Sequence, residues 1–123
     1  MIKTQPHVAV VDDDESVRES LPDLLRQFGY TATAFGSAQE FLSSGRVQDF
    51  HCLILDIAMP GMSGPDLQRE LMNRGRIPPV IFITAHADTR VHATLLKRGA
   101  VAVLIKPFGE SDLLSALKSA LSP

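Results

Sequence analysis

The sequence contains a single cysteine, Cys52, and no long hydrophobic segment. One cysteine cannot form an intrachain disulfide, which fits a protein of a reducing compartment. No apolar run approaches the roughly 20 residues that a membrane-spanning helix needs. The N-terminal residues MIKTQPH are too few and too polar for a signal peptide. These absences predict a cytoplasmic protein that makes no contact with a membrane.

The sequence also lacks an excess of charge of either sign. Its 12 Lys and Arg residues are balanced by 14 Asp and Glu residues, which leaves a net charge of −2. A nucleic-acid-binding face normally carries a cluster of basic residues, so we expect no direct contact with nucleic acid. The length of 123 residues fits one compact domain, and no repeat or linker divides residues 1–123.

Short apolar segments alternate with amphipathic ones along the whole sequence. The apolar segments predict strands at His7–Val11, Tyr30–Phe35, Cys52–Ile57, Val80–Thr84 and Val101–Ile105. The amphipathic segments predict helices at Glu15–Phe28, Ser37–Leu42, Pro65–Leu71, Thr89–Arg98 and Ser111–Leu121. Such alternation is typical of an α/β fold, in which helices cover both faces of a parallel sheet.

Three local signals refine the predicted helices. Pro22 lies inside the first helix, where it removes a hydrogen bond and predicts a kink or an irregular first turn. Ser37 and Glu40 have the spacing of a capping box for the second helix. Ser111 stands where a side-chain cap for the last helix is expected.

Polar side chains occur at the ends of the predicted strands. Asp12 and Asp13 follow the first strand, and Asp56 lies at the end of the third. Thr84 ends the fourth strand, and Lys106 follows the fifth. Because the carboxyl ends of parallel strands share one edge of a sheet, we expect these five side chains to converge in one cleft.

The chemistry of this cleft follows from its charges. Three carboxylates in one cleft repel one another, so a proton or a cation must relieve them. An all-oxygen site suits Mg²⁺, whereas zinc and copper are disfavoured because no His or Cys stands at ligand spacing. With a lysine and a hydroxyl beside it, a carboxylate can accept a phosphoryl group, because the cations neutralise charge in the transition state.

Each of these residues also has a simpler interpretation. The acids of Asp12–Glu15 can serve only as an N-terminal cap for the following helix. Lys106 can be a solvated surface charge, and Thr84 can be present only because it favours strands. Asp56 is harder to explain in this way, since it follows the apolar CLIL directly and precedes a loop. The occurrence of all five residues at strand ends favours a functional site.

Several short motifs follow one another in order along the sequence. They are VDD at Val11–Asp13 with Arg18 following, DIAMPGMSG at Asp56–Gly64, ITA at Ile83–Ala85, GA at Gly99–Ala100 and KPF at Lys106–Phe108. With these motifs the sequence resembles, over nearly its whole length, the receiver domains of two-component response regulators. Regulators of the nitrogen-fixation and LuxR type are the most similar class. The resemblance implies a flavodoxin-like fold with five helices and a five-stranded parallel sheet of order 2-1-3-4-5.

The resemblance implies a role for the acidic residues of the cleft. Asp56 would be the phosphoacceptor. Asp13 and Asp56 would bind Mg²⁺ directly, Asp12 would act mainly through water, and the backbone carbonyl of Ala58 would supply a further ligand. Asp14 stands outside this pattern and is expected to cap the first helix.

The resemblance also implies how the signal is sensed. Lys106 would contact the phosphoryl group, next to a cis peptide bond to Pro107. Thr84 would move its hydroxyl to the phosphoryl group and so report phosphorylation. Many receivers carry an aromatic switch residue three positions before the lysine, where this sequence has Val103. We therefore expect the output surface to move less, or differently, than in typical members.

The resemblance implies partners as well. A histidine kinase or a phosphotransfer protein would donate the phosphoryl group, so the domain would assist its own modification without being a conventional enzyme. Phosphorylation would switch a surface around the fourth helix, fifth strand and last helix, and would promote a homodimer and a transcriptional output. We expect residues 1–123 to form one receiver domain without an effector domain. Two interpretations stay open, a single-domain receiver and the receiver part of a longer DNA-binding regulator.

Three other functions fit the sequence less well. A flavodoxin-like cofactor binder would need a phosphate-binding loop rich in Gly, Ser or Thr after the first strand, where this sequence has acids. A carboxylate-using phosphatase would place a Gly or Thr after its second acid, whereas Glu15 and Ser16 follow Asp14. A degenerate receiver, which binds partners without phosphorylation, would not need all five residues of the cleft.

Overall fold

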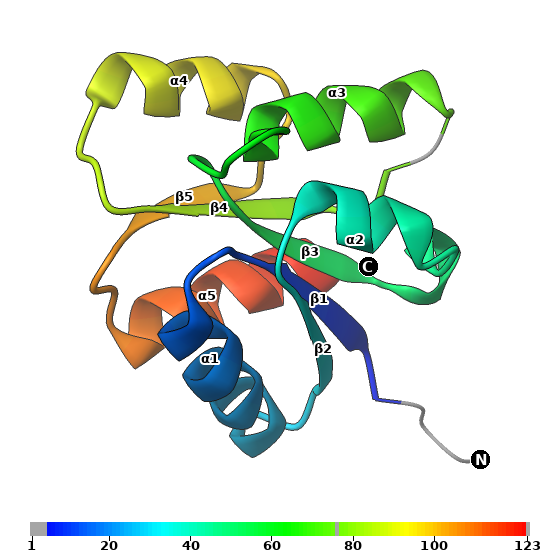
Figure 1. The fold of residues 1–123 in the computed structure, drawn as a ribbon. Coiled ribbons are helices and arrows are strands. Elements are labelled where there is room, and N and C mark those ends of the chain that lie inside the picture. The colour runs from blue at the N-terminus through cyan, green and yellow to red at the C-terminus, as the bar shows by residue number, and fades with distance from the viewer. Residues whose placement is uncertain (1–4, 76, 123) are drawn as a thin grey trace.

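The computed structural model describes residues 5–75 and 77–122, in which five strands alternate with five α-helices (Figure 1). The strands are β1 (His7–Val11), β2 (Thr31–Phe35), β3 (Cys52–Asp56), β4 (Val80–Thr84) and β5 (Ala102–Ile105). The helices are α1 (Glu15–Gln27), α2 (Ala38–Ser43), α3 (Gly64–Asn73), α4 (Thr89–Lys97) and α5 (Glu110–Leu121). A short 3₁₀-helix, η1 (Val47–Asp49), was not predicted.

The strands form one parallel sheet of order β2-β1-β3-β4-β5, which confirms the predicted fold. The order reverses at β1, since β2 lies on one side of it and β3 on the other. A crevice forms beyond the carboxyl ends of the strands at such a reversal, and ligands bind there in folds of this kind. The fold therefore places a binding site next to the ends of β1 and β3.

Side chains alternate between the two faces of the sheet and form two hydrophobic clusters. Helices α2, α3 and α4 cover one face, where Phe41, Leu67 and Leu95 are buried. Helices α1 and α5 cover the other face, where Leu25 and Leu117 are buried, as Figure 1 shows. Burial of each such side chain stabilises the fold by about 1.5–3 kcal/mol. The central strands are therefore held rigidly, and so are the residues at their ends.

Caps begin the helices that lead away from the strand ends. Asp14 caps α1, as predicted, and its side chain accepts a hydrogen bond from the Ser16 N–H at 2.9 Å. Ser63 and Asp66 form a capping box at the start of α3. Such caps satisfy backbone N–H groups that have no partner within the helix. They also set where each loop ends and its helix begins.

Two of the predicted caps differ from the structure. Helix α5 begins at Glu110 with Gly109 as its cap residue, so the prediction that Ser111 caps it is wrong. The carbonyl of Gly109 accepts from the Leu113 N–H, which adds a residue before Ser111 to the helix. At α2, the Ser37 side chain accepts from the Glu40 N–H, but the Glu40 carboxylate accepts from Gly36. The Ser37–Glu40 capping box is therefore only half formed.

Helix α1 contains Pro22 and continues as one helix from Glu15 to Gln27. Asp14 caps its first turn, and the helix is not interrupted at Pro22. Pro22 is buried, as is the preceding Leu21. Within the described residues, no helix has both the length and the apolar character that crossing a membrane requires.

Candidate phosphoacceptor site

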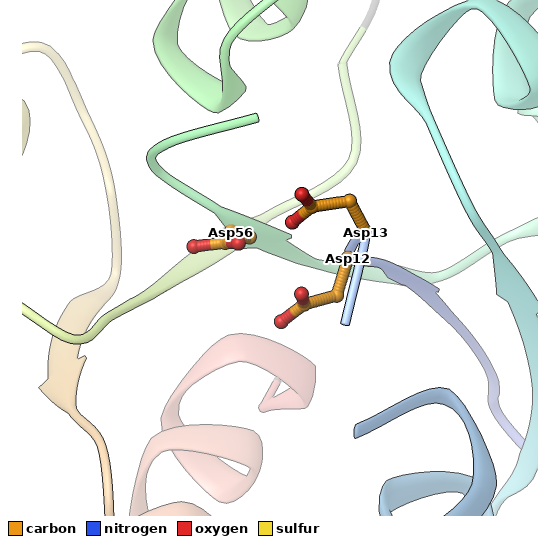
Figure 2. Close-up of side chains that lie close together, drawn as sticks. All are labelled: Asp12, Asp13 and Asp56. Atoms are coloured by element: carbon orange, nitrogen blue, oxygen red, sulfur yellow. The ribbon is translucent and has the colours of Figure 1, made fainter. Parts of the chain in front are cut away.

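Three carboxyl groups lie together at the carboxyl ends of β1 and β3. Figure 2 shows Asp12 and Asp13, from the loop after β1, beside Asp56 at the end of β3. One carboxylate oxygen from each of the three lies within 4.8 Å of the other two. The strand register explains this, because Val11 is paired with Leu55 and an aspartate follows on each strand. Asp12 and Asp56 are buried, whereas Asp13 is exposed to solvent.

Lys106, directly after β5, reaches the same carboxyl groups. Its Nζ donates a hydrogen bond to Oδ2 of Asp12 at 2.9 Å and lies 3.8 Å from Oδ2 of Asp56. The other carboxylate oxygen of Asp12 accepts from the N–H of Asp14 at 2.9 Å. The lysine is therefore in the cleft, where its shorter contact is with Asp12. The peptide bond to Pro107 is cis, as expected.

The charges of the cleft shift the pKa values of its groups. The pKa of Asp56 is raised to about 7, first by burial and then by the negative charge of Asp12, while the positive charge of Lys106 opposes both effects. Burial alone would lower the pKa of Lys106, but its hydrogen bond to Asp12 and the nearby negative charges outweigh burial and raise it. Lys106 therefore stays cationic at neutral pH, and Asp56 lacks enough nearby positive charge to ionise fully.

Thr84 ends β4 at the same edge of the sheet. Its neighbour Ile83 is paired with Asp56, and Thr84 itself is paired with Ile105, the residue before Lys106. The side chain is buried, and its Oγ1 accepts a hydrogen bond from the N–H of His86 at 3.1 Å. The structure thus brings all five of the predicted polar residues to one edge.

The family of the chain follows from comparison with known proteins. A family model of the response regulator receiver domain matches residues 8–118. The chain belongs to this family. Receiver domains are signalling domains that interact with histidine kinases or phosphotransfer proteins, and the resemblance seen in the sequence motifs is confirmed.

Relatives of this receiver domain include a nodulation protein and a transcriptional regulatory protein. Nodulation protein W of Bradyrhizobium diazoefficiens is 44% identical over 117 residues, which cover 95% of this chain and 52% of that protein. The transcriptional regulatory protein FixJ of Azorhizobium caulinodans is 40% identical over 114 residues, which cover 93% of this chain and 54% of that protein. The chain spans about half the length of these curated relatives.

A solved structure shows the same fold. The response regulator StyR superposes with a TM-score of 0.87 at 45% identity, covering 96% of this chain and 60% of that chain. The match supports the flavodoxin-like architecture that the strand order had indicated. The cofactor-binding alternative is disfavoured because β1 of this receiver domain leads directly into acids rather than into a phosphate-binding loop.

The carboxylate cluster fits a hard divalent cation. Asp12, Asp13 and Asp56 offer only oxygen ligands, which is the donor set that Mg²⁺ prefers. Burial and the neighbouring Asp12 charge raise the pKa of Asp56, and Lys106 offsets this only in part. A bound cation would favour the ionised carboxylate and lower this pKa. The residues present therefore suit Mg²⁺, the ion that receiver domains typically use in this pocket.

The loop between β3 and α3 contains Ala58 and a residue that the sequence interpretation missed. Ala58 is exposed two positions after Asp56, where a backbone carbonyl can face the cleft only if the loop is held in place. Gly64 holds it, because its N–H donates to the carbonyl of Ile57 at 3.0 Å. A Cβ at Gly64 would overlap the backbone carbonyl oxygen of Asp56. The sequence feature that could have identified Gly64 is its position between Ser63, which caps α3, and Pro65 in the first turn of that helix.

Arg18 is a second residue whose contact was not anticipated. Its Nη1 donates to the backbone carbonyl of Asp12 at 3.1 Å, from the first turns of α1. The sequence motif includes Arg18 by spacing only, six positions after Asp12. The contact holds the backbone at the start of the β1–α1 loop. Arg18 therefore positions Asp12 and Asp13 without belonging to the cleft itself.

Proposed function

We propose that this receiver domain accepts a phosphoryl group on Asp56 from a phosphohistidine of a histidine kinase or phosphotransfer protein. The observation that supports this most directly is the position of Asp56. It is a buried carboxyl group placed beside two further acids and 3.8 Å from the Lys106 ammonium. A carboxylate needs nearby cationic charge to act as a phosphoryl acceptor; Lys106 supplies part of this charge, and a bound Mg²⁺ would supply the rest.

Each residue of the cleft has its own role in the phosphoryl transfer. A carboxylate oxygen of Asp56 attacks the phosphorus, the P–N bond of the donor breaks, and its electron pair returns to the donor imidazole. The product is an acyl phosphate on Asp56. Lys106 binds one phosphoryl oxygen, for which it has to turn from Asp12 toward Asp56. The hydroxyl of Thr84 donates to another phosphoryl oxygen and so senses the modified state.

The acids of the cleft would hold Mg²⁺ during this reaction. Asp13 and Asp56 are the proposed direct ligands, together with the backbone carbonyl of Ala58. Asp12 is proposed to act through water, since its oxygens already accept from Lys106 and from the Asp14 N–H. When bound, the ion neutralises negative charge on the transferring phosphoryl group. Hydrogen bonds from Arg18 and Gly64 hold the two loops that supply these ligands in position.

The consequence of phosphorylation is proposed to be a shift between two conformations of the surface around α4, β5 and α5. Such a shift would promote a homodimer and control a transcriptional output, either attached to this domain or in a separate protein. The names of FixJ and its relatives, which are regulatory proteins of about twice this length, support a transcriptional output.

Intact-mass measurement after incubation with acetyl phosphate and Mg²⁺ tests the proposal. The native protein should gain the mass of one phosphoryl group, and Asp56→Asn should gain none. Asp13→Asn should still fold but gain the group slowly, because a proposed Mg²⁺ ligand is missing. If no adduct forms on the native protein, the proposal is wrong and a receiver that acts without phosphorylation is favoured. If the adduct persists in Asp56→Asn, the phosphoryl group is carried by another residue and the assignment of Asp56 is wrong.

A further inference from the structure

The loop between β4 and α4 is held by two hydrogen bonds that share His86. The N–H of His86 donates to Thr84 Oγ1 at 3.1 Å. The carbonyl oxygen of His86 lies 3.1 Å from Nε2 of His92, which belongs to α4. A carbonyl can only accept, so Nε2 of His92 carries the hydrogen. These contacts connect the buried threonine of the cleft to α4 through one residue.

The same connection continues into the start of α4. Oδ1 of Asp88 accepts from the N–H groups of Arg90 and Val91, at 3.0 Å and 3.3 Å, and so caps the helix. The carbonyl of Asp88 accepts from the N–H of His92 at 3.0 Å. His92 is therefore bound through its ring to the loop and through its backbone to the cap residue. A change in the loop at His86 acts on the first turn of α4 directly.

An alternative path through β5 is limited by Val103. This residue is half-buried and packs against the cluster that contains Leu95 of α4. Its small, branched side chain offers no ring that could rotate between a buried and an exposed position. The loop contacts at His86 and His92 are the hydrogen bonds that join the Thr84 side chain to α4 within the part of the chain that the structure describes.

We propose that the His86–His92 hydrogen bond belongs to the unphosphorylated conformation and that its loss carries the signal from Thr84 to α4. This inference rests on the proposed phosphorylation of Asp56. When the Thr84 hydroxyl moves to the phosphoryl group, the N–H of His86 loses its acceptor and the loop is released. The carbonyl of His86 then leaves His92, and the start of α4 becomes free to move.

The proposal predicts a measurable effect on a phosphoryl mimic. If the bond stabilises only the inactive conformation, removing it raises the small active population and the apparent affinity for the mimic by the same factor. The net contribution of one such hydrogen bond corresponds to a factor of about three to ten. His92→Ala should therefore bind beryllofluoride, with Mg²⁺ present, about three to ten times more tightly than the native protein.

Two further variants make the comparison specific. His92→Gln keeps an N–H donor near the position of Nε2, so its affinity for beryllofluoride should return toward the native value. Thr94→Ala serves as the matched control, because Thr94 Oγ1 donates to the carbonyl of Arg90 at 3.0 Å on the same exposed helix. That bond is internal to α4 and does not reach the loop. Thr94→Ala should leave the affinity unchanged.

The outcomes separate this proposal from the proposed function. Equal beryllofluoride affinity of His92→Ala and the native protein overturns the role of His92 but leaves phosphorylation of Asp56 intact. Failure of the native protein to bind beryllofluoride, with Asp56→Asn behaving identically, overturns both. If His92→Ala does not fold, the ¹⁵N–¹H signals of the native His92 imidazole decide. They must shift when beryllofluoride binds, and unchanged signals contradict the proposal.

Discussion

The ammonium of Lys106 donates a 2.9 Å hydrogen bond to Asp12, whose side chain is completely buried. The proposed phosphoacceptor is the more distant of the two carboxylates that the lysine contacts. In the absence of a phosphoryl group, Lys106 therefore has a structural role. It balances a buried charge that the fold requires at the end of β1.

Lys106→Met should accordingly destabilise the protein as well as impair signalling. Removing one partner of a buried ion pair leaves the other charge uncompensated, and here we expect a loss of roughly 2–4 kcal/mol in the free energy of unfolding. Mg²⁺ should recover part of this loss, because the ion supplies a replacement positive charge. Urea unfolding with Mg²⁺ and with EDTA measures both effects. Lys118→Met, at an exposed position of α5, is the control and should change little.

Asp56 makes the stability of the metal-free protein depend on pH. Its pKa is about 7 in the folded protein and 3.8 in the unfolded reference, so between these values the folded state binds more protons. The free energy of unfolding should therefore fall as the pH rises through this window and level off above about pH 7. Unfolding in EDTA across pH 5–8.5 measures this slope for the native protein and for Asp56→Asn.

The neutral amide of Asp56→Asn does not titrate, so the difference between the two proteins isolates Asp56. We expect Asp56→Asn to be the more stable protein at pH 8, with a melting temperature higher by several degrees for a change of about 1 kcal/mol. Saturating Mg²⁺ should remove most of the difference. Parallel pH profiles for the two proteins in EDTA would show that Asp56 ionises without hindrance, contrary to the raised pKa.

Gly64→Ala should disturb the phosphoacceptor without touching its side chain. The added Cβ would overlap the carbonyl oxygen of Asp56 and lie 3.2 Å from the ring of Phe82, so α3 or the end of β3 must move. We expect a loss of about 1–3 kcal/mol in stability and slower phosphorylation by acetyl phosphate. The mass assay and thermal unfolding measure the two effects.

Gly109→Ala is the matched control for this substitution. A Cβ at Gly109 would meet only the Asp112 carboxylate, at an ordinary 3.7 Å, and the backbone there has a common conformation. Its phosphorylation rate should equal that of the native protein. Equal rates for Gly64→Ala and Gly109→Ala would mean that the loop tolerates the extra atom and that Gly64 does not position Asp56.

The architecture and the members of the site were predictable from the sequence for a shared reason. Short apolar segments such as CLIL, followed by a loop, are typical of buried strands, and parallel strands bring their carboxyl ends together. Asp12 and Asp56 thus had to meet once β1 and β3 were neighbours. This inference needs the order of elements and no side-chain geometry. The role of Asp14 as a helix cap was also predictable, because an acid before an amphipathic segment is a common cap residue.

The partners of individual side chains were not predictable in this way. The preference of Lys106 for Asp12 over Asp56 depends on a difference of about an ångström in reach. Glu40 accepts from Gly36 rather than from Ser37, and α5 begins one residue before the expected cap. Such choices depend on backbone geometry at loop ends, where competing hydrogen bonds have similar free energies. The role of Gly64 likewise depends on a tertiary contact that spacing does not reveal.

The proposed dimer can be tested on two exposed apolar side chains of the switching surface. Leu96 on α4 is 47% exposed and Ile105 on β5 is 42% exposed. Beryllofluoride with Mg²⁺ should convert the native monomer to a dimer in gel filtration. Leu96→Lys and Ile105→Lys should prevent dimer formation, because a charge buried in the interface lacks a partner. Both variants should still bind beryllofluoride at Asp56.

Met72→Lys is the control, since Met72 is 49% exposed but lies on α3, away from that surface. It adds the same charge at a similar exposure, so it should dimerise like the native protein. If Met72→Lys fails to dimerise while Leu96→Lys succeeds, the interface involves α3 instead of α4 and β5. If the native protein stays monomeric with beryllofluoride bound, phosphorylation acts through a different partner, because the switched surface has then been shown not to recognise a second copy of itself.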